Sequence, residues 1–251
     1  MVELAFFHIA VFVVAAIAGF IGPIAGGGGL LMIPSLVLLG APSEVAIASV
    51  RLGAIGLWVS ALYRYHRGGL VPWKRAFLLS FFGIAGGYIG SRLLIWLSDS
   101  SETVDTYVAI IILCMLPITY VYRRIKKFSW EPPVFVQALG YPLFLLVMSF
   151  AGFFSGGDGT LGIYVLVLCF GCSIVEANAL RALPWLCMGI VASTQYIQAG
   201  LVDYTMALDL FLGMFVGGYI GASTAIKKGE DWVQRVFTVV VLLLVTKLLF
   251  F

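Results

Sequence analysis

The sequence predicts an all-α polytopic membrane protein, and three observations support this fold class. Hydrophobic residues make up 62% of the 251 residues and charged residues only 11%, whereas soluble domains carry about 25% charged residues. Apolar stretches long enough for a helix to cross ~30 Å of hydrocarbon recur along the chain. The second half of the chain also repeats the pattern of the first. This composition excludes soluble enzymes, nucleic-acid-binding proteins and disordered tails, because so apolar a globule would expose large hydrophobic patches to water.

Each half of the chain contains five apolar segments. They span 4–22, 29–40, 44–63, 73–96 and 104–122 in the first half, and 133–152, 159–171, 174–198, 204–226 and 232–251 in the second. Four segments of each half are long enough for a membrane-spanning helix, which needs about 20 residues. The second segment is shorter, and its ~12 residues rise only about 18 Å as a helix. One end of each short segment is therefore expected to lie inside the membrane, after a Gly-rich turn.

The two halves agree at an offset of 130–131 residues. Gly22, Gly26, Gly27 and Gly29 fall on Gly152, Gly156, Gly157 and Gly159, Arg51 falls on Arg181, Tyr65 on Tyr196, and Gly86–Gly90 on Gly217–Gly221. Internal duplication in a membrane protein is typical of transporters. We therefore predict a first membrane repeat at 1–127 and a second at 128–251.

Charge predicts how the two repeats are oriented. Most Lys and Arg residues lie in three clusters, within 64–75, 123–127 and 227–235, and such clusters mark cytoplasmic loops. Five crossings in each repeat place all three clusters on the cytoplasmic side and both termini outside. The alternative, with four crossings in each repeat and re-entrant short segments, would put Lys227 and Lys228 on the opposite side. The charge pattern therefore favours repeats of inverted topology.

The Gly-rich turns at 22–29 and 152–159 are the first candidate binding elements. Each precedes a short segment, whose helix N-terminus would offer unpaired N–H groups and the positive end of a helix dipole to an anion. Glycine lets the backbone approach a ligand without a Cβ in the way. The alternative is that these are closely packed turns without a ligand.

Arg51 and Arg181 are the sharpest chemical feature of the sequence. Each lies about eight residues into the third segment of its repeat, which places both near the membrane midplane, where an arginine costs ~2.5–3.5 kcal/mol. Guanidinium groups suit oxyanions, so we expect both to face a bound substrate. The alternative is an internal salt bridge with Glu44, Glu176 or Asp158.

The remaining candidate residues lie near the Gly-rich turns and the two arginines in the sequence. Asp158 falls where the first repeat has Gly28, and Asp158 and Glu176 are candidates for proton coupling. Trp185 lies one turn beyond Arg181 and could flank a cavity or simply fill the core. The predicted substrate-binding residues are Gly27, Gly28, Gly29, Arg51, Ser155, Gly157, Asp158, Gly159, Thr160, Arg181 and Trp185.

No catalytic set, metal site or cofactor motif is evident. Cys169 and Cys172 form a C-x-x-C pattern, but no second Cys/His pair completes a metal site. His8 and His66 lie far apart in the sequence. We therefore expect a protein that is not an enzyme.

The residues resemble a known family. The Gly-rich turns before short segments, Pro34, the stretch GAPSEVAIAS at 40–49 and the pair YHRGGLVPW at 65–73 and YIQAGLVDY at 196–204 are similar to the sulfite exporter TauE/SafE family, also called DUF81 or TSUP permeases. The resemblance covers essentially the whole chain. It implies a multi-pass permease of the bacterial or archaeal cytoplasmic (inner) membrane that moves sulfur-containing anions, such as sulfite or organosulfonates, typically outward. Asp158 departs from the all-Gly turn of the first repeat, which leaves the substrate and any coupling ion open.

The predicted function is therefore secondary transport of a small oxyanion or sulfonate, by alternating access between the two repeats. The expected partners are this anion and the lipid bilayer, not nucleic acid, and a homodimer is one candidate assembly. The alternatives are a passive anion channel and, further off, a membrane-embedded enzyme or receptor.

Overall fold

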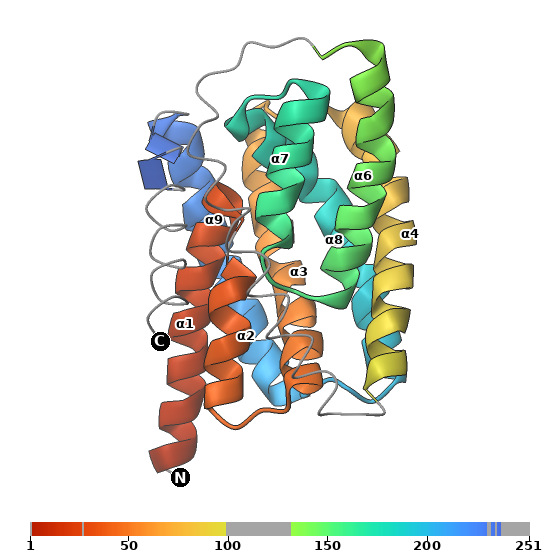
Figure 1. Ribbon diagram of the computed structural model, residues 1–251. Helices are drawn as coiled ribbons and strands as arrows, with labels where there is room; N and C mark the ends of the chain where they lie inside the picture. The colour runs from red at the N-terminus through yellow and green to blue at the C-terminus, as the bar shows by residue number, and fades with distance from the viewer. Residues whose placement is uncertain (1, 27, 99–131, 230–231, 234, 237–251) are drawn as a thin grey trace.

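A computed structural model describes residues 2–26, 28–98, 132–229, 232–233 and 235–236. Within those residues the chain forms eight α-helices and no strand (Figure 1). They are α1 (Val2–Ala25), α2 (Gly28–Leu38), α3 (Ser43–Arg67), α4 (Trp73–Leu97), α6 (Val134–Phe153), α7 (Asp158–Phe170), α8 (Ile174–Gln198) and α9 (Tyr204–Lys228). The predicted segment 104–122 and most of 232–251 lie outside the described residues. The predicted all-α fold is confirmed for the part of the chain described.

Helix length separates the elements into two groups. Six described helices are long and apolar enough to cross a membrane, whereas α2 and α7 have only 11 and 13 residues. The two short helices coincide with the segments that the sequence predicts to be short. Prolines and glycines set several of the helix ends. Pro42 and Pro72 precede α3 and α4, and Gly171, at φ 67°, ends α7, because proline suits the start of a helix and glycine its end.

The two halves of the chain are interleaved in the bundle. Helix α9 packs against α1 and α3, and α4 packs in the corresponding way against α6 and α8. Helices α3 and α8 also pack against each other and are the most buried of the six long helices. Each half therefore completes its core with the fourth helix of the other half.

Glycine faces allow this close packing. A Cβ added at Gly217 of α9 would lie 2.1 Å from the Ala16 carbonyl oxygen of α1, and one at Gly90 of α4 would lie 2.0 Å from the Ser149 carbonyl oxygen of α6. Helices in lipid associate through such small-residue faces, because the hydrophobic effect does not drive helices together in a solvent as apolar as their surfaces.

Matching helices of the two halves run in opposite directions. In Figure 1, α1 starts at the lower end of the bundle, where the N-terminus is marked, whereas α6 starts at the upper end. Helix α3 runs upward and α8 runs downward in the same view.

Two of the predicted basic clusters meet at one end of the bundle. The Arg64 guanidinium lies 5.0 Å from the centre of the Tyr219 ring, and Arg64 and Lys227 line a common surface hollow. The residues around 67 and 228 therefore share one end of the molecule. The third cluster, within 123–127, lies outside the described residues.

Candidate functional site

The two Gly-rich turns meet in the interior of the bundle. A Cβ added at Gly26 would lie 2.4 Å from the Gly159 carbonyl carbon, and one at Gly29 would lie 1.7 Å from the Ser155 carbonyl oxygen. Gly26 and Gly157 both have φ 75°, a conformation that favours glycine. The backbone of the turn between α1 and α2 is therefore in direct contact with the backbone of the turn between α6 and α7.

The C-terminal end of α1 is capped by side chains from other helices. Carbonyl oxygens at a helix end lack intrahelical partners, and inside a membrane water is not available to replace them. The donors are Arg181 Nη2 to Gly22 O at 2.7 Å, Tyr65 OH to Pro23 O at 2.9 Å, Asn178 Nδ2 to Ile24 O at 3.2 Å and Thr160 Oγ1 to Ala25 O at 3.0 Å. Each of the last four carbonyls of α1 therefore accepts a hydrogen bond from a side chain.

The end of α6 is held in a similar way. Arg51 Nη2 donates a hydrogen bond to the Ala151 carbonyl, and the Tyr196 hydroxyl donates one to the Gly152 carbonyl. We call α1–α2 and α6–α7 the broken helices, because a Gly-rich turn interrupts each pair inside the bundle. Arg51 comes from the first half and Arg181 from the second, so each arginine reaches the broken helix of the other half. Part of the work of both arginines is thus to cap a helix end.

Asp158, at the first position of α7, stands beside Arg51. Its Oδ2 accepts a hydrogen bond from Trp185 Nε1 at 2.8 Å and lies 3.8 Å from Arg51 Nη1. Arg51 is 2% exposed and Asp158 6%, so these are two buried opposite charges. Of the acids considered as partners for the arginines, Asp158 is the one within ion-pair distance of Arg51.

Arg181 lies close to two indole rings. Its guanidinium carbon is 4.7 Å from the centre of the Trp58 ring and 5.6 Å from that of Trp185. Its Nε and Nη2 both donate to Asn178 Oδ1, at 3.0 and 2.7 Å, but Nη1 has no hydrogen-bond partner among the described residues. A fully buried cation thus keeps one NH2 group without a hydrogen-bond partner among the described residues, close to Gly159.

A small cavity opens at this meeting point. Its volume is about 40 Å³, and one buried water needs roughly 10–15 Å³. It can therefore hold a few waters or one small anion. Its lining comes from both halves and comprises Ala18, Gly22, Gly26, Gly28, Gly29, Val50, Arg51, Ala54, Leu57, Trp58, Ser155, Asp158, Gly159, Trp185 and Met214.

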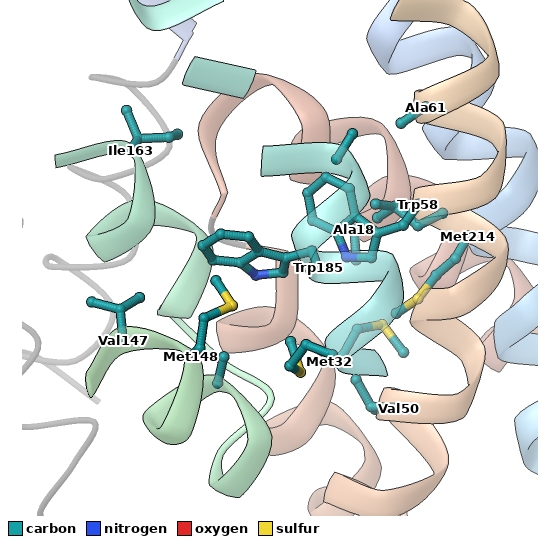
Figure 2. Close-up of a cluster of buried hydrophobic side chains, with 14 of the residues drawn as sticks. Ala18, Met32, Val50, Trp58, Ala61, Val147, Met148, Ile163, Trp185 and Met214 are labelled. Carbon is teal, nitrogen blue, oxygen red and sulfur yellow. The ribbon is translucent and has the colours of Figure 1, made fainter. Parts of the chain in front are cut away.

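Apolar side chains surround the polar cluster. Figure 2 shows the Trp58 and Trp185 rings among buried hydrophobic residues, with Met32, Met148 and Met214 below the two indoles in this view. Such surroundings strengthen electrostatic interactions inside the cavity, because the local dielectric constant is far below that of water.

The structure brings most of the predicted site residues together. The candidates that line the cavity are Gly28, Gly29, Arg51, Ser155, Asp158, Gly159 and Trp185. Thr160 and Arg181 are not among the lining residues but bond the Ala25 and Gly22 carbonyls at the end of α1, and Gly157 is the residue before α7. Gly27 lies outside the described residues.

Glu176 lies apart from this cluster. It is exposed at the start of α8, where its carboxylate accepts a hydrogen bond from the Ser173 N–H at 2.9 Å and the Ser173 hydroxyl accepts one from the Glu176 N–H. This is a capping box, which stabilises a helix start.

The tyrosine and asparagine caps are not among the site residues predicted from the sequence. Tyr65 and Tyr196 fall on each other in the internal repeat, so a polar aromatic residue kept in both copies of an apolar segment was a usable signal. Asn178 precedes Arg181 by three residues, which places both on one face of a helix. What the sequence does not show is that their acceptors are carbonyls at the ends of α1 and α6.

No metal centre is formed by the residues described. Among them, no group of three or more His, Cys, Asp or Glu side chains is close enough to hold an ion.

Fold and site together define an integral membrane protein with a charged cavity between two broken helices. The sulfite exporter TauE/SafE family model matches residues 11–248, and the chain belongs to this family. The family resemblance drawn from the glycine turns is therefore confirmed.

Curated relatives agree with this assignment. The chain is 27% identical, over 99% of its length, to the probable membrane transporter protein ORF9 of Sinorhizobium sp, of which it covers 95%. It is 25% identical over 95% of its length to a probable membrane transporter protein of Haemophilus influenzae, covering 93% of it. It is 27% identical over 95% of its length to the probable membrane transporter protein YfcA of Escherichia coli, covering 88%. No solved structure matches the chain. The protein is thus a multi-pass membrane transporter and not an enzyme.

Proposed function

We propose that this transporter is a secondary carrier of small sulfur-containing anions, such as sulfite or organosulfonates, and that it moves them outward. The observation that carries the proposal is the cavity where the two broken helices meet, with Arg51 in its wall and Arg181 beside it. The family's description as sulfite exporters supports the substrate class and the direction.

The cavity offers the chemistry that an oxyanion needs. Charge-assisted hydrogen bonds from a guanidinium are among the strongest in proteins. The N-terminal ends of α2 and α7 both border the cavity through Gly28, Gly29, Asp158 and Gly159, and helix N-termini favour negative charge. The indole rings of Trp58 and Trp185 form part of the cavity wall and limit the size of the anion that fits.

Alternating access between two inverted repeats, 1–127 and 128–251, is the proposed transport mechanism. The opposite directions of α1 and α6, and of α3 and α8, support this organisation (Figure 1). So do the interleaved packing of α4 and α9 and the position of the cavity between the halves. In other carriers with inverted repeats, rocking of one repeat against the other exposes a fixed central site to each side in turn.

Asp158 is the proposed proton-coupling residue. It is buried in the cavity wall, whereas the capping box of Glu176 favours a structural role for the second candidate. Replacement of Asp158 by Asn should abolish uphill transport while exchange of labelled anion persists. Equal loss of both activities would contradict coupling through Asp158.

Transport by purified protein in liposomes tests the proposal. Sulfite, sulfoacetate, taurine, isethionate and thiosulfate are offered in turn, at matched pH and membrane potential. A carrier gives saturable flux and accumulates its anion against a gradient, whereas the alternative, a passive anion channel, gives unsaturated flux that stops at equilibrium. Absence of flux and of binding for all five compounds would contradict the substrate class.

The relatives also support a location for this transporter. The relatives named above come from bacteria, and we place the protein in the bacterial inner membrane. A homodimer is the proposed assembly to test first, by mass measurement of the detergent-solubilised protein.

A further inference from the structure

The two halves of the cavity differ in charge. Asp158 is the single acidic residue among the described residues that line it. In the first half, the corresponding turn carries only glycine from Gly26 to Gly29. The two arginines at matching positions of the internal repeat therefore have different surroundings. Arg51 lies beside a carboxylate. Arg181 lies beside glycine backbone and two indole rings.

In the Arg51–Asp158 pair, the Nη1 group of Arg51 makes no hydrogen bond to the carboxylate. Arg51 Nη1 is 3.8 Å from Asp158 Oδ2, which is beyond hydrogen-bonding distance. The same Oδ2 accepts the indole N–H of Trp185 at 2.8 Å, which fixes the carboxylate in place. Asp158 thus balances the charge of Arg51 without accepting a hydrogen bond from Nη1.

We propose that Asp158 is a tethered competitor of the transported anion, and that it sets the charge of the anion that the cavity prefers. This inference rests on the proposed anion-carrier function. In the empty cavity the carboxylate compensates Arg51, because an unpaired buried cation would be strongly unfavourable. An arriving oxyanion needs the same guanidinium, and its negative charge is repelled by the carboxylate of Asp158.

Charge arithmetic gives the consequence for selectivity. With Asp158 ionised, the two guanidinium groups of Arg51 and Arg181 and the one carboxylate together leave a single net positive charge. One monovalent anion balances that net charge, whereas a divalent anion would leave one buried negative charge without a partner, which is strongly unfavourable. The wild-type cavity therefore prefers monovalent anions, such as sulfonates, over divalent anions of the same size.

The test replaces Asp158 by Asn, which keeps the shape of the side chain and an oxygen that can accept the Trp185 N–H. Binding is measured by calorimetry at one pH with methanesulfonate, which is monovalent, and with sulfate, which is divalent. We expect both to bind at least about tenfold more tightly to Asp158→Asn, because a charged competitor is removed, and sulfate to gain more. Asp209→Asn, which removes an acid paired with His8 away from the cavity, should leave both affinities unchanged.

A double-mutant cycle with Arg51→Ala separates competition from general repulsion. If Asp158 competes for Arg51, the gain from Asp158→Asn is much smaller once Arg51 is absent. An equal gain in both backgrounds would overturn competition at Arg51, and so would weaker binding to Asp158→Asn itself. Each variant is used only as monodisperse protein with a measured unfolding temperature.

The same data distinguish failure of this inference from failure of the proposed function. If Arg51→Ala weakens anion binding but Asp158→Asn does not strengthen it, the carrier proposal stands and the competitor role is wrong. If wild-type protein binds neither the probe anions nor the five sulfur compounds, the anion-carrier function itself is wrong.

Discussion

Arg51 and Arg181 each combine two roles in one side chain. One part of each guanidinium caps a carbonyl at a broken helix end, at Ala151 and Gly22 respectively. Arg51 also lines the cavity, and Nη1 of Arg181 has no hydrogen-bond partner among the described residues. Arginine suits this double task because its five donors are arranged in a rigid fork, whereas the ammonium of lysine is a compact point charge.

The first prediction concerns these two arginines. Arg51→Ala and Arg181→Ala should each weaken anion binding ~10–150-fold, since a charge-assisted hydrogen bond contributes roughly 1.5–3 kcal/mol. Arg51→Lys and Arg181→Lys should restore only part of the affinity, because lysine cannot serve the carbonyl and the anion together. Calorimetry on folded, monodisperse protein measures the effect. Near-normal affinity in both alanine variants would leave the arginines as structural caps and remove them from the binding site.

The second prediction uses the charge at the start of α9. Asp203 accepts hydrogen bonds from the Thr205 hydroxyl and from the Met206 and Thr205 N–H groups, and these, the hydroxyl most of all, hold the pKa of its carboxyl below its ordinary value. A lowered pKa means that this stabilisation is complete above the unfolded value of about 3.9. It is lost as pH falls through the lower folded pKa.

Asp203→Asn keeps a capping oxygen but not the charge, so it isolates this contribution. Wild type should be the more stable protein at pH 6, and its advantage should shrink as the pH approaches 3. Unfolding temperatures in detergent across this range measure the difference. An advantage that stays constant with pH would show that the charge of Asp203 does not stabilise α9.

At the scale of elements, the fourth helix of each half holds the bundle together through glycine. Gly90 and Gly217 bring α4 and α9 so close to α6 and α1 that even one added carbon would overlap a carbonyl oxygen. Packing in lipid depends on such contacts, since the surrounding acyl chains are as apolar as the helix surfaces.

The third prediction tests this packing with a matched pair of substitutions. Gly217→Ala should destabilise the protein by about 1–3 kcal/mol, the usual range for overpacking, because the new Cβ would lie 2.1 Å from the Ala16 carbonyl oxygen. Gly189→Ala, also inside a helix, would meet its nearest neighbour at 3.6 Å. It should be neutral or stabilising by up to ~1 kcal/mol, since alanine favours a helix over glycine. Chemical unfolding in detergent compares the two, and equal effects would argue against the close contact of α1 and α9.

At the scale of the whole molecule, the described basic clusters gather at one end. Arg64 and Lys227 share a hollow there, while His8, Asp203 and Asp209 belong to the other end, where α1 and α9 begin. By the positive-inside rule, we expect the basic end to face the cytoplasm.

The fourth prediction is a labelling pattern. In a cysteine-free background, Arg67→Cys and Lys228→Cys should react with a membrane-impermeant thiol reagent from the same side of the membrane, and Ser98→Cys from the opposite side. The reason is that α3 and α9 end together, whereas α4 ends at the other end of the bundle (Figure 1). Reaction of positions 67 and 228 from opposite sides would replace the inverted arrangement by a parallel one.

The sequence predicts the elements of this fold better than their contacts. Hydrophobic length identifies the spanning helices, and the duplication identifies the short α2 and α7, because both signals are local or periodic. The positions of Arg51 and Asp158 are likewise predictable, since charges are rare in apolar segments. The contacts of Arg181 with Gly22 and of Tyr196 with Gly152 are not, because they depend on how distant helices pack and on backbone acceptors that every residue carries.

The side-chain caps of α1 also constrain how the protein is made. The donors to Gly22, Ile24 and Ala25 come from Arg181, Asn178 and Thr160, which lie 159, 154 and 135 residues later in the chain. During synthesis, α1 enters the bilayer long before these residues leave the ribosome. Until then, the end of α1 has exposed carbonyls that lipid cannot satisfy. A chain released after its first half would keep this defect permanently.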